Sequence, residues 1–326
     1  MRRIFGRSRT RCRACFAGSR RLVVVLHALE RFLESFEGTS ELLAERIIEA
    51  NGVELCTEPF GDPADPPILL VTGVGGSMLW WDEGFCRMLV EGGRFVIRYD
   101  HRDTGRSVTY EPGRPDYTSA DLVADAVGVL DAYAIPAAHF VGVSAGGAFA
   151  HLLALHYRHR VRSLVLISTS PATPGERSLP PATDRYRRFL TTATVDWSDE
   201  GSVVEYLVDY ARVLAGGERP FDEAAVRELV CRDVARARNI ASSENHGAIS
   251  EGAMPHRPLS SIGVPTLVIH GTADPMFPPE HGQALAGEIP GARLLTLEGA
   301  GHGVDPADWE PVVRTIVEHT AAAHGG

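Results

Sequence analysis

The sequence predicts an α/β protein with a mostly parallel sheet that carries helices on both faces and is interrupted by a helical insertion. Three observations support this fold class. Short apolar runs rich in β-branched residues alternate with segments of helical spacing. Several of these runs are apolar throughout, as expected for strands that are covered on both faces. The alternation stops near residue 171 and resumes after residue 258.

The spacing of apolar residues sets the expected elements. Strands are expected at residues 53–57, 68–71, 95–100, 139–143 and 163–169 before the interruption, and at residues 266–270 and 293–297 after it. Helices in these two parts are expected at residues 120–134, 148–156, 279–288 and 309–319. Helices within the interruption are expected at residues 182–192, 203–214 and 223–240. The sequence therefore predicts a core made of residues 45–170 and 259–322 and a helical cap made of residues 171–258.

Residues 1–44 are predicted to be an extension outside the core. The first 20 residues are rich in arginine, serine and glycine and are expected to be disordered. Residues 19–24 resemble a twin-arginine export signal, but no small-residue cleavage site follows the apolar stretch 22–29. A helix over residues 22–36, or a start site placed too far upstream, explains this region better than export does.

Composition excludes several function classes. All 32 basic residues are arginine, which rules out a lysine nucleophile, a Schiff base and a Walker-type phosphate lysine. Residues 1–29 hold eight arginines and no acidic residue, so the rest of the chain has 24 basic against 42 acidic residues and a net charge of −18. Such a body repels nucleic acid and anionic membranes. No apolar run approaches the roughly 20 residues of a membrane span. We expect a cytoplasmic protein that acts on a small molecule, and a homodimer is compatible with the sequence.

The cysteines predict neither disulfides nor a metal site. They are scattered and odd in number. The pair Cys12 and Cys15 has zinc-like spacing but lacks a second pair or nearby histidines. We therefore expect no bound metal and no cofactor.

The strongest motif surrounds Ser144. A predicted strand ends at Val143 and a helix follows, with Gly142 two residues before the serine and Gly146 two residues after it. This G-x-S-x-G pattern is typical of a nucleophile elbow, in which a sharp strand-to-helix turn exposes a strained serine. The flanking glycines are expected because side chains there would collide within the turn.

A serine hydroxyl needs a base and a group that orients the base. Asp274 and His302 each follow one of the last two predicted strands, within glycine-containing loops. Because the carboxyl ends of parallel strands share one edge of a sheet, we expect both side chains near Ser144. Asp305 and His270 are weaker competitors for the two roles. His151, His156 and His159 are predicted to lie on the surface.

Acyl transfer also needs hydrogen-bond donors for the developing oxyanion. The backbone N–H of Ala145, directly after the serine, is one expected donor. The other is the N–H of Val74, in the glycine-rich loop after the strand at residues 68–71. Gly73, Gly75 and Gly76 would let this backbone approach the site closely, and a plain turn is the alternative.

Four segments carry a resemblance to a known family. They are residues 60–66 (FGDPADP), 96–107 (VIRYDHRDTGRS), 142–147 (GVSAGG) and 264–269 (VPTLVI). With them the chain resembles the α/β-hydrolase-fold serine hydrolases, and most of all the aclacinomycin methylesterase branch. The similarity runs from about residue 52 to residue 319 and fails across the predicted cap.

The resemblance implies a role for each candidate residue. It implies Ser144 as nucleophile, His302 as base, Asp274 as the group that orients the base, and no cofactor. Residues 100–107 match an Asp-rich, Arg-Gly turn of the family, which we interpret as shaping a loop beside the site. The resemblance does not carry a substrate over, because the cap that would shape the pocket is where the match fails.

Apolar and aromatic residues suggest the kind of substrate. Gly73, Met78, Trp81, Met276 and Phe277 are the predicted pocket residues. Further candidates, which ordinary core packing would explain equally well, are Trp80, Tyr186, Phe189, Tyr206 and Met254.

We predict a serine hydrolase that cleaves a carboxylic ester of a small, largely apolar molecule through an acyl-enzyme. Lactone or amide hydrolysis and a cofactor-free, haloperoxidase-like perhydrolase reaction use the same groups and stay open. A non-catalytic ligand receptor on the same scaffold is the alternative of another class, which the presence of all three catalytic groups disfavours.

Overall fold

The computed structural model describes residues 44–172 and 178–323. From Glu45 onward the described residues form one compact unit. The predicted N-terminal extension, including Cys12, Cys15 and the helix expected at residues 22–36, lies outside the described residues apart from Ala44.

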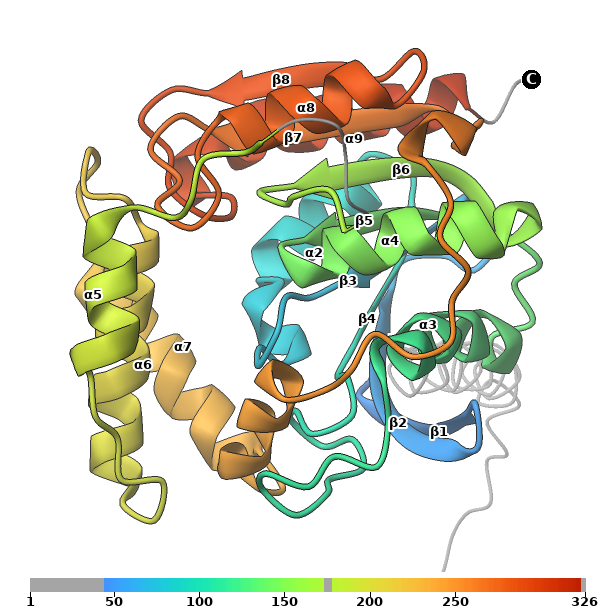
Figure 1. The fold of residues 1–326 in the computed structure, drawn as a ribbon. Helices are drawn as coiled ribbons and strands as arrows, with labels where there is room; N and C mark the ends of the chain where they lie inside the picture. The colour runs from blue at the N-terminus through green and yellow to red at the C-terminus, as the bar shows by residue number, and fades with distance from the viewer. Residues whose placement is uncertain (1–43, 173–177, 324–326) are drawn as a thin grey trace, which may run out of the picture. The chain divides into compact units, whose positions relative to one another are not determined.

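The described residues contain an eight-stranded sheet in the order β1-β2-β4-β3-β5-β6-β7-β8 (Figure 1). The strands are β1 (Arg46–Ala50), β2 (Val53–Phe60), β3 (Pro67–Val71), β4 (Phe95–Tyr99), β5 (Ala138–Val143), β6 (Val161–Ile167), β7 (Thr266–Gly271) and β8 (Arg293–Leu297). Only the pairs β1–β2 and β2–β4 are antiparallel, and the remaining neighbours run parallel. The predicted fold class is confirmed.

Within residues 44–172 and 178–323, five helices flank the sheet in two layers. They are α2 (Glu83–Glu91), α3 (Ser119–Ala132), α4 (Ala145–His156), α8 (Glu280–Glu288) and α9 (Trp309–Ala322). Residues of α3, α4 and α8 share one apolar core with the sheet, and residues of α2 and α9 share the other. Strand β3 shows why its sequence is apolar throughout: Leu69 and Val71 enter the first core, whereas Ile68 and Leu70 enter the second.

Residues 171–258, called here the inserted segment, form helices α5 (Asp184–Thr192), α6 (Glu200–Leu214) and α7 (Glu223–Arg236), which lie together beside the sheet in Figure 1. Valines of α6 and α7 form a small apolar cluster of their own. The helix predicted to continue to Ile240 ends at Arg236, because the next segment turns away and Arg238 N donates to Gly105 O at 2.7 Å.

Short 3-10 turns complete the described elements. They are η1 (Met78–Trp80), η2 (Arg158–Arg160), η3 (Ile240–Gly247), η4 (Leu259–Ser261) and η5 (Pro306–Asp308).

Among the described strands and α-helices, β1 and α2 have no counterpart in the sequence prediction. Strand β1 pairs with β2 through a hairpin in which Asn51 and Gly52 both have positive φ, 48° and 76°. An Asn-Gly pair between two strands is a strong hairpin signal, so β1 was predictable. Helix α2 is only nine residues long. It buries Phe85, Cys86 and Leu89, a stripe too short to stand out by its period.

Candidate active site

Ser144 stands between the end of β5 and the start of α4, as predicted. Its backbone has φ 55° and ψ −124°, a conformation that residues with side chains rarely adopt. The side chain is largely buried, with a relative exposure of 7% for the residue. The sharp turn therefore stores strain at the one position that presents a hydroxyl group.

The two glycines of the motif are required by close backbone approaches. A Cβ atom on Gly142 would lie 2.3 Å from the carbonyl oxygen of Gly146. A Cβ atom on Gly146 would lie 2.1 Å from the carbonyl oxygen of Val71, where the start of α4 passes the end of β3. Neither position has room for a side chain, which agrees with the steric reason expected from the sequence.

Asp274 and His302 are hydrogen-bonded to each other on the loops after β7 and β8. His302 Nδ1 lies 2.9 Å from Asp274 Oδ2, while Asp274 Oδ1 accepts the amides of Met276 and Phe277, both at 2.9 Å. Burial alone would raise the pKa of Asp274, but His302 and the Phe277 amide hold it below its ordinary value. A charged carboxylate thus places the proton of the imidazole on Nδ1 and leaves Nε2 free to accept one.

Ser144 and His302 line one cavity without a hydrogen bond between them. His302 Nε2 is buried and has no hydrogen-bond partner among the described residues. Ser144 Oγ contacts Met276 Sδ at 4.0 Å. Catalytic hydrogen bonds are often long in unliganded enzymes and tighten with substrate. The structure therefore brings the three predicted residues to one site, with the Asp274–His302 bond formed.

The glycine-rich loop, residues 72–76, runs directly beside the serine. A Cβ atom on Gly73 would lie 3.1 Å from Ser144 Cβ. The amides of Val74 and Ala145 have no acceptor in the part of the chain that the structure describes. Val74 lines the cavity, and 46% of the residue is exposed. Both predicted donors are thus available, as an oxyanion site requires.

Two buried histidines hold this loop, and sequence reasoning assigned a role to neither. Gly75 N donates to His246 Nδ1 at 2.9 Å, and His246 Nε2 lies 2.7 Å from Arg102 O. His101 Nε2 lies 3.1 Å from Thr72 O. His101 belongs to the 100–107 turn, so its place near the site had a signal. His246 comes from the inserted segment and had none.

The 100–107 turn has the structural role that we expected. Asp100 is fully buried, and its two carboxylate oxygens accept the amides of Met78 and Arg106 at 2.8 and 2.9 Å. Arg236 of α7 pairs with the same carboxylate at 2.7 Å. These contacts fix the loop against its neighbours and use both carboxylate oxygens of Asp100.

The competing residues are engaged elsewhere. His270 Nε2 lies 2.7 Å from Phe277 O and 3.7 Å from Asp274 Oδ2, so its N–H donates to the Phe277 carbonyl. Asp305 accepts the amide of Ala307 at 2.8 Å and caps η5. Neither residue replaces Asp274 or His302 in the observed arrangement.

The surface position predicted for His151 is wrong. His151 is completely buried in α4, where its Nε2 accepts the amide of Ala172 at 3.2 Å. Burial lowers its pKa to about 4. His156 is half-buried and His159 is exposed. The apolar neighbours of His151 in the sequence form the buried face of α4. The prediction overlooked that the histidine itself lies in that face.

The cavity at Ser144 has a volume of about 630 Å³. Of the predicted pocket residues, Gly73, Trp81 and Met276 line it, and Met78 and Phe277 do not. Met78 is fully buried in η1. Phe277 packs between His281 and His302, with ring centroids 5.2 and 5.7 Å away. The predicted site thus needs correction at these two positions.

The inserted segment supplies much of the aromatic wall. Its rings at the cavity are those of Trp197, Tyr206, Tyr210 and Phe221. Among the further candidates, Trp80 and Tyr206 line the cavity, whereas Tyr186, Phe189 and Met254 pack elsewhere. The cavity therefore has the aromatic lining that we expected, but only two of these five candidate residues belong to it.

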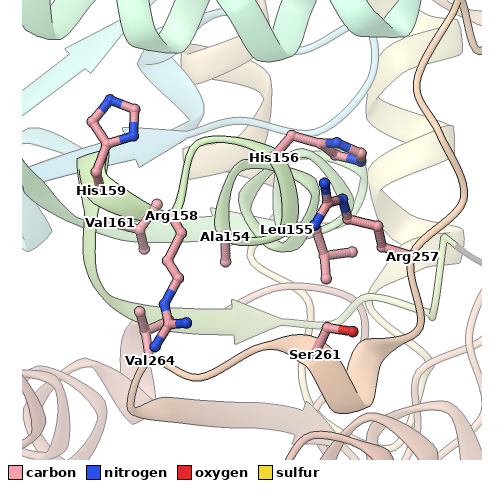
Figure 2. Close-up of a pocket in the computed structure, with 9 residues that line it drawn as sticks. All are labelled: Ala154, Leu155, His156, Arg158, His159, Val161, Arg257, Ser261 and Val264. Atoms are coloured by element: carbon pink, nitrogen blue, oxygen red, sulfur yellow. The ribbon is translucent and has the colours of Figure 1, made fainter.

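A second cavity of about 640 Å³ opens between the end of α4, η2 and η4 (Figure 2). Arg158, His159 and Arg257 lie around it, and Figure 2 shows His159 directed away from the others. It contains none of the candidate catalytic residues. The cavity at Ser144 is therefore the candidate active site.

Within the described ranges, no group of three or more His, Cys, Asp or Glu side chains could hold a metal ion. Cys56, Cys86 and Cys231 are free thiols. None of the helices of residues 44–172 and 178–323 has the length and apolar character needed to cross a membrane.

Comparison with known proteins finds similarity over most of the chain. The family model described as alpha/beta hydrolase fold matches residues 66–196, and a model of TAP-like proteins matches residues 245–319. Rhodomycin D methylesterase DnrP of Streptomyces peucetius is 34% identical over 302 residues, 85% of this chain and 98% of that protein. Rhodomycin D methylesterase DauP of Streptomyces sp. (strain C5) is 35% identical with the same coverage. The solved enol-lactonase of Burkholderia xenovorans LB400 is 25% identical with a TM-score of 0.66, over 85% of this chain and 100% of that one.

Proposed function

The chain belongs to the α/β-hydrolase family and is a carboxylic ester hydrolase, and from this premise we propose that it cleaves the methyl ester of a bulky, ring-bearing acid through an acyl-enzyme on Ser144. The single observation that carries the serine mechanism is the buried Asp274–His302 hydrogen bond of 2.9 Å at the cavity that Ser144 lines.

In the first half-reaction Ser144 Oγ attacks the ester carbonyl carbon, and His302 Nε2 takes the hydroxyl proton. The tetrahedral intermediate collapses when the bond to the alkoxy oxygen breaks, and His302 returns the proton to that oxygen, so that methanol leaves. Asp274 keeps the imidazole in the tautomer with the proton on Nδ1 and stabilises the imidazolium that forms.

In the second half-reaction a water molecule attacks the acyl-enzyme and His302 again acts as base. The acid leaves when the bond to Ser144 Oγ breaks and the serine recovers its proton. The negative charge that develops on the carbonyl oxygen in both steps is stabilised by the amides of Val74 and Ala145. Such a donor contributes roughly 3–4 kcal/mol to the transition state.

The cavity supports a bulky acyl group. Its volume of about 630 Å³ far exceeds what an acetyl group fills, and flat aromatic rings from the inserted segment form one wall. We propose that the inserted segment acts as the cap of the site. The names of DnrP and DauP, both rhodomycin D methylesterases, favour methanol as the small leaving alcohol.

We also propose the kind of partner that the protein binds and the compartment in which it works. The net charge of −10 supports a small-molecule substrate and disfavours a nucleic-acid partner. The free thiols of Cys56, Cys86 and Cys231 fit a reducing compartment, so we place the enzyme in the cytoplasm.

The test combines covalent labelling with a substrate series. A fluorophosphonate should label Ser144 in the folded protein, and Ser144→Ala should lose at least about a thousandfold in kcat, with a melting temperature close to that of the parent protein. Methyl, butyl and lactone forms of the same polycyclic acid then compare leaving groups, with the methyl ester expected to be cleaved fastest. Labelling at another residue, or an active Ser144→Ala variant, would refute the serine mechanism. Faster cleavage of the lactone would refute the methyl ester assignment alone.

A further inference from the structure

The glycine-rich loop that carries the Val74 amide is held by a residue far away in the chain. His246 lies in η3 of the inserted segment, 171 residues after its partner Gly75. Only 6% of its surface is exposed. Its ring stands 5.9 Å from that of His101, the other histidine that contacts this loop. The inserted segment therefore forms a hydrogen bond with the backbone of the loop that runs beside the serine.

The two hydrogen bonds of His246 define its tautomer. A backbone amide can only donate, so Nδ1 must accept the hydrogen bond from the Gly75 N–H and carries no proton itself. The proton is then on Nε2, which donates to the carbonyl oxygen of Arg102 at 2.7 Å. His246 is thus a neutral imidazole whose donor and acceptor are both used within the protein.

Its surroundings keep it neutral. Burial lowers the pKa of His246, against the opposing effects of the Arg102 carbonyl and the Asp103 carboxylate. The titratable groups around the ring are His101, Tyr117 and Asp103. A proton on Nδ1 would point at an amide that can only donate, so the charged form would lose the bond to Gly75.

The two histidines hold the loop on either side of the peptide unit that contains the Val74 N–H. His101 holds the carbonyl oxygen of Thr72, which belongs to the peptide unit between Thr72 and Gly73. His246 holds the amide of Gly75, which belongs to the unit between Val74 and Gly75. The unit between them contains the Val74 N–H. Both neighbours of that peptide unit are therefore held by imidazoles, in a backbone where Gly73 and Gly75 would otherwise rotate freely.

We propose that His246 is a positioning residue that orients the Val74 amide for the oxyanion by accepting the Gly75 N–H. This inference rests on the proposed function and adds a residue to its machinery. It also assigns the inserted segment a second role besides lining the cavity, because the segment supplies the hydrogen-bond acceptor that the glycine-rich loop needs.

Two matched substitutions separate the two bonds of the imidazole. In His246→Asn the amide oxygen takes the place of Nδ1, so the acceptor for Gly75 is kept. In His246→Gln the amide nitrogen takes the place of Nε2, so the donor to Arg102 is kept and the acceptor is lost. Removing an oxyanion donor costs about a hundredfold to a thousandfold in kcat. For a misplaced donor we expect a loss of about 10- to 100-fold in the Gln variant.

The expected result is a split between the two kinetic constants. The Gln variant should lose kcat while KM stays within about threefold, and the Asn variant should recover to within about threefold of the parent kcat. His256→Gln, the same change at an exposed position of the inserted segment, is the control and should match the parent. A fully active Gln variant, or equal losses in the Asn and Gln variants, would overturn the proposal.

A spectroscopic measurement on the unmodified protein covers the case in which a variant fails to fold. Nitrogen-15 NMR of histidine-labelled protein should show His246 with an unprotonated Nδ1 and a protonated Nε2 at about pH 8 and still at about pH 6.5, the ordinary pKa of the side chain, because burial lowers the pKa of this residue. The opposite tautomer, or protonation of Nδ1 near pH 6.5, would contradict the proposal. Fluorophosphonate labelling of Ser144 in the same samples distinguishes the cases: labelled protein with the wrong tautomer refutes the positioning role alone, and unlabelled protein refutes the serine mechanism.

Discussion

The core and the inserted segment contribute to the site in different ways. The core provides Ser144, Asp274 and His302 from the ends of β5, β7 and β8, each within a turn that contains glycine. The inserted segment provides no predicted catalytic residue. It holds the site from outside: Leu214 O accepts the amide of His302 at 2.8 Å, and His246 accepts that of Gly75 at 2.9 Å.

This difference shows how two parts of one chain can supply the reacting groups and the pocket wall of a single site. The core positions are set by the geometry of parallel strands, which end at a common edge. The contacts from the inserted segment are set by tertiary packing and use backbone groups of the core as partners. A change in the inserted segment can thus alter the pocket and the catalytic loops together.

The largest expected effect tests the core side of the comparison. Asp274→Asn removes the charge that sets the tautomer of His302 and should lower kcat about 10³- to 10⁴-fold. Steady-state kinetics on the preferred ester measures it. Asp305→Asn, the same change on the competing carboxylate, should lose far less activity. If the two variants exchanged these effects, Asp305 would be the orienting group.

The next effect compares close backbone packing in the two regions. Gly146→Ala places a Cβ atom 2.1 Å from Val71 O, so the start of α4 must move away from β3. We expect the free energy of unfolding to fall by at least about 3 kcal/mol. Gly247→Ala, at the end of η3, meets no atom within 4 Å and should change it by less than about 1 kcal/mol. Urea unfolding measures both, and similar losses in both variants would contradict the contrast.

The smallest effect concerns the junction of the two regions, where His151 of α4 accepts the amide of Ala172. Burial lowers the pKa of His151 to about 4 in the folded protein, whereas in the unfolded chain its pKa is about 6.5. Between these two pH values the His151 imidazole therefore binds a proton in the unfolded chain but not in the folded protein. Stability therefore falls as the pH falls through this window, by about 1.4 kcal/mol per pH unit for this group.

His151→Gln should remove that share of the slope between pH 6.5 and 4.5 while its amide oxygen still accepts the Ala172 amide. Urea unfolding at several pH values provides the slopes. His159→Gln, at an exposed position, serves as the control and should leave the slope unchanged. A slope in the His151 variant equal to that of the parent would mean that the imidazole titrates alike in both states.

Predictability follows the same division. The sheet and the elbow were predictable because strand periodicity, glycine-flanked turns and chain order are local signals. Asp274 and His302 were found for the same reason. His246 was not, because its acceptor role depends on a contact with a backbone amide 171 residues away. Met78 and Phe277 were assigned to the pocket on their apolar character, but Met78 is fully buried in η1 and Phe277 packs its ring against His281 and His302.

The bond between Gly75 and His246 makes one part of the site depend on the inserted segment more directly than the rest. Ser144, Asp274 and His302 all follow strands of the sheet. The glycine-rich loop, in contrast, takes a hydrogen-bond acceptor from η3. A molecule in which η3 was undocked would keep all three side chains at the ends of their strands and would leave the Gly75 amide without its acceptor.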